Sequence, residues 1–125
     1  MIEYWLSVEN TTLSPDGYTR QTLTFNGTIP GPAIIADWGD NLVIHVTNNL
    51  EHNGTSIHWH GIRQLGSLEY DGVPGVTQCP IAPGDSLTYK FQASKYTLAT
   101  ILRSLLGFRI QAFRKFLGIV WDTYF

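Results

Sequence analysis

The segment "DSLTYKFQA", residues 85–93, has the clearest strand pattern in the chain. Apolar and polar side chains alternate along it without interruption. Because successive side chains of a strand point to opposite faces of a sheet, this pattern predicts a half-buried antiparallel strand. The two predicted faces consist of Leu87, Tyr89 and Phe91 on one side, and Ser86, Thr88, Lys90 and Gln92 on the other.

Shorter runs toward the N-terminus show strand character and are separated by turn-forming residues. The run Ser-Pro-Asp-Gly at 14–17 favours a turn, and Pro30 and Pro32 exclude a helix around them. Strands that recur at roughly ten-residue spacing, with turns between them, favour a β-sandwich. The expected strands of this all-β fold lie at 3–8, 20–25, 41–49 and 85–93.

Length and composition limit the classes of protein that the chain can belong to. Its 125 residues are enough for one domain and too few for two. Hydrophobic residues make up 43% and charged residues 14%, which is typical of a globular chain rather than a disordered one. The net charge of −2 provides no electrostatic basis for binding nucleic acid, so no such partner is expected.

Two of the four histidines, His58 and His60, flank Trp59 in the run "SIHWHGIRQL". On a strand the two imidazoles would share one face, with their Cα atoms about 6.6 Å apart. That spacing suits binding of one metal, or of two metals roughly 3.5–4 Å apart. Copper, zinc, iron and nickel all accept imidazole, so the pair alone does not identify the metal. The alternative to a metal site is a pair of polar side chains on a solvated strand face. The other two histidines, His45 and His52, lack the His-X-His spacing.

The single cysteine, Cys79, cannot form a disulfide within the chain. It is either a small buried hydrophobe or one half of a bridge to a partner outside these residues. Three N-glycosylation sequons, which begin at Asn10, Asn26 and Asn53, favour a secreted, extracellular glycoprotein. The run "MIEYWLSVENTT" has no signal-peptide character, so we expect a secreted form to need a leader that these residues lack.

The chain changes character near residue 96. Residues 1–96 contain nine acidic and four basic side chains, whereas residues 97–125 contain one acidic and four basic ones. Most apolar side chains of 98–121 fall on one stripe of a helix. The four cations of this region argue against a membrane span. The alternatives are an interfacial amphipathic helix and a helix that packs on the domain or stays poorly ordered.

The pattern "NGTIPGPAIIADWGDNLVIHVTNNL", followed by "HWHG" and "DGVPGVTQCPIAPG", resembles the N-terminal plastocyanin-like (cupredoxin) domain of a fungal laccase, a multicopper oxidase. The resemblance extends from about Glu3 to Tyr96. It implies an incomplete Greek-key cupredoxin-like β-sandwich over 1–96. The aberrant, basic and apolar tail over 97–125 does not match the family.

The resemblance also implies a chemistry, because the family uses copper to oxidise phenolic substrates and to reduce O2 to water. In this resemblance His58 binds the type-2 copper and His60 binds a type-3 copper of a trinuclear cluster. Asp71 resembles an acid that assists proton delivery to the cluster; from the residues alone, an ordinary Asp-Gly turn is the alternative. Trp59 is expected in the core, and Cys79 resembles a cysteine that bridges to another part of a full-length laccase.

The sequence departs from the family after Tyr96. The family continues with a second His-X-His pair, whereas residues 97–125 contain no histidine. We therefore expect no laccase activity from this chain alone. We also expect unpaired strand edges, which favour aggregation.

Two other functions follow from the same residues. A small blue-copper electron carrier is disfavoured, because its site needs histidines, a cysteine and an axial ligand such as Met, and no histidine follows Cys79. The alternative that stays open is a non-enzymatic secreted or membrane-surface-associated protein, bound through its basic tail.

Overall fold

The computed structural model describes residues 1–37, 39–60, 62–93 and 111–114. The regular structure of this part of the chain is strand, apart from a single short turn of 3-10 helix. The elements are β1 (Ile2–Leu13), β2 (Arg20–Phe25), β3 (Asn41–Asn48), β4 (Thr55–His58), η1 (Leu68–Tyr70), β5 (Ser86–Gln92) and β6 (Gln111–Arg114).

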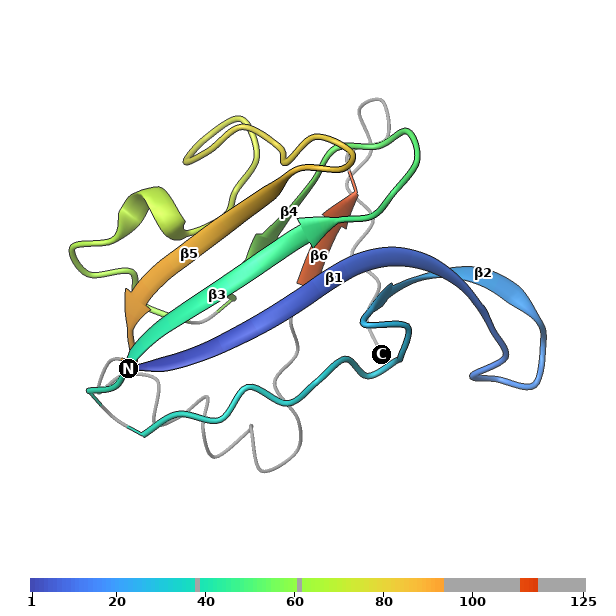
Figure 1. Cartoon of the computed structure of the whole chain (residues 1–125), viewed down its shortest axis with the longest axis horizontal. Helices are drawn as coiled ribbons and strands as arrows, with labels where there is room; N and C mark the ends of the chain where they lie inside the picture. The colour runs from blue at the N-terminus through green and yellow to red at the C-terminus, as the bar shows by residue number, and fades with distance from the viewer. Residues whose placement is uncertain (38, 61, 94–110, 115–125) are drawn as a thin grey trace.

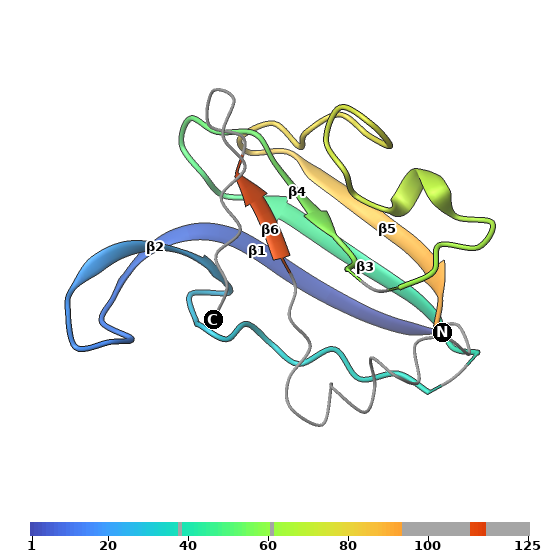
Figure 2. The same cartoon turned by 180° about the vertical axis from the view of Figure 1, so that it is seen from behind.

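Four strands form an open sheet in the order β2-β1-β3-β5 (Figure 1). β1 pairs antiparallel with β2 and parallel with β3, and β3 pairs antiparallel with β5. β4 and β6 form a second, two-stranded sheet against one face of the first, as the view from behind shows (Figure 2). The predicted all-β, incomplete sandwich is confirmed.

The strands agree closely with their predicted positions. β2 has the predicted bounds, and β3 and β5 fall within the predicted 41–49 and 85–93. β1 is longer than the predicted 3–8, because it continues to Leu13 and pairs there with β2. The turn between them lies at the predicted place, where the Gly17 amide donates to the Ser14 carbonyl at 3.1 Å.

The core lies between the two sheets. Alternation along β3 and β5 directs every second side chain toward it. The segment that includes β4 contributes two large side chains from the opposite layer, and Trp59 is in the core as expected. The buried hydrophobic residues of these three segments are Leu42, Ile44, Val46, Tyr89, Phe91, Ile57 and Trp59.

The tail requires a correction. The helix expected over 98–121 is wrong for residues 111–114, which form β6 and pair antiparallel with β4. An available strand edge offers backbone hydrogen bonds that outweigh a helical spacing of side chains. The rest of 97–125, including most of the expected helix, lies outside the described residues. Within the described residues, no helix is long and apolar enough to cross a membrane.

Candidate metal centre

The histidine pair lies at the end of β4. The strand stops at His58, and His60 follows two residues later in a turn, so one continuous strand does not hold both as predicted. The alternation nevertheless persists, because Ile57 and Trp59 are buried while His58 is partly buried and His60 is exposed. The two imidazole rings meet edge to face with centroids 5.7 Å apart. This distance keeps both rings within reach of one metal ion or of two adjacent ions.

A hydrogen bond to the backbone determines the tautomer of His58. Its Nδ1 lies 2.8 Å from the carbonyl oxygen of Asp71. A carbonyl oxygen only accepts, so Nδ1 carries the proton and donates it. In the neutral ring the lone pair is then on Nε2. A backbone carbonyl that accepts from one ring nitrogen, and so leaves the metal to the other, is the usual support of a metal-binding histidine.

The carboxylate of Asp71 also lies beside the same ring. Its Oδ2 is 3.5 Å from Nδ1 of His58, and the two side chains are 21% and 19% exposed. The carbonyl is the closer partner of Nδ1, and the carboxylate adds a negative charge beside the ring. The fold thus places Asp71 beside His58, two residues that the sequence named separately.

A glycine allows this approach. Gly72 follows Asp71, is buried and has a φ of +81°. A Cβ atom at this position would overlap the carbonyl group of Ile57 on β4. Only a residue without a side chain lets the turn lie directly against β4, with the Asp71 carbonyl facing His58. The Asp-Gly turn that the sequence offered as an alternative to a functional Asp71 is therefore itself part of the site.

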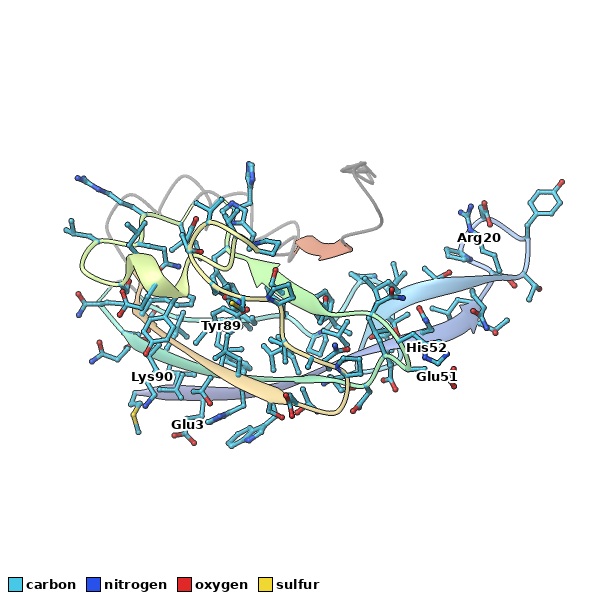
Figure 3. The ribbon with its side chains drawn as sticks, turned by 90° about the horizontal axis from the view of Figure 1, so that it is seen from above. Glu3, Arg20, Glu51, His52, Tyr89 and Lys90 are labelled. Atoms are coloured by element: carbon cyan, nitrogen blue, oxygen red, sulfur yellow. The ribbon has the colours of Figure 1, made fainter. Side chains whose placement is uncertain are left out.

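The two other histidines lie elsewhere. His45 of β3 is on the outer face of the four-stranded sheet, where its ring stacks on Trp5 at 5.2 Å and its Nδ1 is 2.9 Å from Thr88 Oγ1. His52 is in the exposed loop before β4, with Nε2 3.6 Å from Glu51 Oε2 (Figure 3). Neither joins the pair.

The residues present fit part of a copper site. In the described part of the chain, no group of three His, Cys, Asp or Glu side chains could hold a metal ion. Two imidazoles, one with its tautomer fixed, suit copper as members of a larger ligand set. The pair therefore provides two donors, and a closed site needs further ligands from other segments.

Of the remaining predicted residues, Asn10, Asn26 and Cys79 are exposed, whereas Asn53 is partly buried. Cys79 is exposed, which removes the interpretation as a buried hydrophobe and leaves the bridge as a prediction. Asn10 is exposed on β1. The Asn26 side chain is engaged with β1, because it accepts from the Ser7 amide at 2.6 Å and donates to the Trp5 carbonyl at 3.2 Å.

Two contributors to the site were not identified from the sequence. Gly72 was seen only as part of a turn, and its close approach to β4 could not be read from the dipeptide. Tyr89 was assigned to the core by alternation, but its hydroxyl also accepts a hydrogen bond from the Ile57 amide at 3.2 Å. Burial raises the pKa of this hydroxyl, and the Ile57 hydrogen bond opposes the rise. The signal available in the sequence was a hydroxyl-bearing side chain, Tyr89, on a face that is otherwise apolar, with Leu87 and Phe91.

Comparison with known proteins decides the family. The family described as multicopper oxidase matches residues 7–102. The chain belongs to the multicopper oxidase family. Laccase-2 of Botryotinia fuckeliana is 86% identical over 94 residues, which cover 75% of this chain and 16% of that protein. Laccase-1 of the same fungus is 72% identical over 93 residues, which cover 74% of this chain and 17% of that protein.

Solved multicopper oxidases have the same fold over this region. The laccase from Botrytis aclada is 88% identical with a TM-score of 0.72, over 74% of this chain and 17% of that one. Fet3p, a multicopper oxidase that functions in iron import, is 37% identical with a TM-score of 0.71, over 75% of this chain and 18% of that one. The laccase resemblance and the cupredoxin-like sandwich are confirmed. The chain spans about a sixth of the length of the curated relatives it matches.

Proposed function

We propose that this chain is a copper-binding unit of a laccase-type multicopper oxidase, with His58 and His60 as copper ligands. The hydrogen bond from His58 Nδ1 to the Asp71 carbonyl is the observation that carries the proposal, because it leaves Nε2 as the metal-binding atom. By resemblance, His58 would bind the type-2 copper and His60 a type-3 copper. When bound in a complete cluster, copper would supply the electron transfer from phenols to O2.

The residues of this chain have a narrower role than the whole reaction. His58 and His60 bind and orient metal, and Asp71 holds a negative charge and a proton acceptor within 3.5 Å of the His58 ring. One imidazole pair does not make a cluster, so the chain alone is expected to oxidise no phenolic dye above a free-copper control. Oxidase activity, phenolic substrates and O2 belong to the proposal for a protein of the relatives' length.

Copper titration tests the proposal directly. We expect the full chain to bind Cu(II) with nitrogen couplings in its electron paramagnetic resonance spectrum, and His58→Ala or His60→Ala to weaken binding by about tenfold or more. His52→Ala is the matched control, since His52 is an exposed imidazole away from the pair. Equal copper affinity in the His58, His60 and His52 variants would overturn the assignment.

Secretion and glycosylation also belong to the proposal. Of the three sequons, Asn10 is the best placed, because both Asn10 and Thr12 are exposed. The Asn26 amide is engaged with β1, and Thr55 of the third sequon is buried. We propose an extracellular protein in which Asn10 is the most fully glycosylated of the three sequons. Peptide mapping of secreted material checks this, and a glycan at Asn53 alone would contradict it.

A further inference from the structure

The fold connects the middle of its core to the histidine pair through one side chain. Tyr89 lies on β5, in the four-stranded sheet, and is fully buried. Its side chain extends between the two layers toward β4 (Figure 3). There its hydroxyl accepts a hydrogen bond from the Ile57 amide at 3.2 Å. Ile57 is the residue immediately before His58.

The backbone of Ile57 faces the edge of β4 that is opposite β6. Thr55, two residues earlier, exchanges hydrogen bonds with Ile81 at 3.1 and 2.7 Å. Backbone groups of residues two apart in a strand point to the same edge, so Ile57 points to the Ile81 side as well. At Ile57 the Tyr89 hydroxyl meets the amide, and Gly72 lies against the carbonyl. A side chain and a turn thus take the place of a neighbouring strand.

Tyr89 also contacts the residue on the other side of His58. The Trp59 ring meets the Tyr89 ring edge to face at a centroid distance of 5.3 Å. The indole also packs on Phe91 at 5.0 Å. Tyr89 therefore holds Ile57 through its hydroxyl and Trp59 through its ring. Because side chains alternate across the backbone, fixing these two buried neighbours fixes the direction of the imidazole between them.

We infer that Tyr89 is a positioning residue for His58. Tyr89 holds the end of β4 so that the His58 imidazole faces His60 and the Asp71 carbonyl. The inference rests on the proposed copper function for its consequence and on the contacts above for its geometry. Its hydroxyl group is the separable part, since Tyr89→Phe keeps the ring that packs on Trp59. The substitution removes the acceptor for the Ile57 amide and the hydroxyl's hydrogen bond with the Gln78 side chain.

The chain offers a matched control. The Tyr4 hydroxyl also bonds to backbone, donating to the Ile35 carbonyl at 2.8 Å and accepting from the Ile35 amide at 2.9 Å. Tyr4→Phe therefore makes the same chemical change on β1 and removes two backbone hydrogen bonds instead of one. A general loss of stability would appear in both variants, whereas a change at the histidine pair is expected only in Tyr89→Phe.

The experiment compares the full chain with both variants in two measurements. Without metal, amide exchange and the imidazole nitrogen signals of His58 are followed by NMR. We expect Tyr89→Phe to speed exchange of the Ile57 amide by about tenfold and to shift the His58 Nδ1 signal, with neither change in Tyr4→Phe. With Cu(II) added, we expect the dissociation constant to rise about three- to tenfold in Tyr89→Phe alone, with altered nitrogen couplings.

The outcomes separate this inference from the proposed function. If the unaltered chain binds Cu(II) no better than His58→Ala, the copper proposal fails, while the metal-free signals still test the positioning. Unchanged Ile57 exchange and His58 signals in Tyr89→Phe would overturn the inference. An equal loss of copper affinity in Tyr4→Phe and Tyr89→Phe would overturn it as well, because the effect would then be one of general stability.

Discussion

At the scale of single residues, the site depends on a glycine, which has no side chain, as much as on the histidines. His58 is held by a backbone carbonyl, and that carbonyl reaches it because Gly72 has no Cβ atom. The residues that we propose as metal ligands and the residue that permits the geometry are therefore of different kinds. Substitutions can separate them.

Gly72→Ala is expected to lower the free energy of unfolding by about 3 kcal/mol or more, since it adds an overlap with the Ile57 carbonyl to a left-handed backbone. Gly75→Ala is the control, because Gly75 has a similar φ of +78° but open space around it. There we expect about 1 kcal/mol. Urea denaturation measures both, and equal losses would contradict the proposed close packing of the turn on β4.

Asp71→Asn is expected to leave metal binding within about threefold of the unaltered chain, because the backbone carbonyl, rather than the side chain, is the near partner of Nδ1. Copper titration near pH 7 checks this. A loss as large as that of His58→Ala would show that the carboxylate, not the carbonyl, supports the ring.

At the scale of elements, β4 is a short strand with different partners on its two edges. Ile57 meets Tyr89 and Gly72 on one edge, and the strand pairs with β6 on the other. Directly opposite residues of an antiparallel pair alternate between hydrogen-bonded and non-hydrogen-bonded. Because the Ile57 amide is directed to Tyr89, the pair of Ile57 and Ala112 is non-hydrogen-bonded, and Ser56 with Phe113 is the bonded pair.

Proline substitution in β6 tests this register. We expect Phe113→Pro to speed amide exchange at Ser56 roughly tenfold. Proline lacks the amide that donates to the Ser56 carbonyl, and its fixed φ disturbs the reciprocal bond from the Ser56 amide. Ala112→Pro places the same residue where the amide points away from β4, and a smaller effect is expected. We also expect more aggregated protein for Phe113→Pro by sedimentation, because it unpairs a strand edge. The reverse order of the two variants would refute the assigned pairing.

The elements also show what the sequence could predict. β3 and β5 were predictable because one face of each is buried, and burial enforces a period of two. The end of β4 at His58 was not, because the alternation of buried side chains continues past the last paired residue. β6 was not predicted either: its pairing depends on an edge more than fifty residues away in the sequence, whereas its side-chain spacing is helical. The histidine pair was predicted from spacing, but its supporting carbonyl depends on a turn 13 residues later.

At the scale of the whole molecule, a buried tyrosine joins the two layers. Its burial makes the free energy of unfolding depend on pH in the alkaline range. Burial raises the pKa of Tyr89 in the folded chain above its ordinary value of 10.0. Above about pH 10 the unfolded chain loses this proton while the folded chain keeps it, so the unfolded state is favoured. The stabilising contribution is complete below pH 10 and is lost as the pH rises through the folded-state pKa.

We therefore expect the urea midpoint of the unaltered chain to fall more steeply between pH 9.5 and 11, a range set by the ordinary tyrosine pKa of about 10, than that of Tyr89→Phe. Lysines and the other tyrosines are common to both proteins and cancel in the comparison. Parallel curves for the two chains would mean that Tyr89 ionises alike in the folded and unfolded states, against its burial.

The position of β1 inside the sheet has a consequence for synthesis. β1 is made before its two sheet partners, and β2 follows at once to form a hairpin with it. The other edge of β1 pairs in parallel with β3, where Ile2 lies opposite Leu42. Because β3 follows β2 in the sequence, this second partner is translated later. At about 5–20 residues per second, the nascent hairpin presents an open edge for roughly one to five seconds before β3 is made. Chaperone capture during translation should therefore fall on β1, and should end once β3 has emerged.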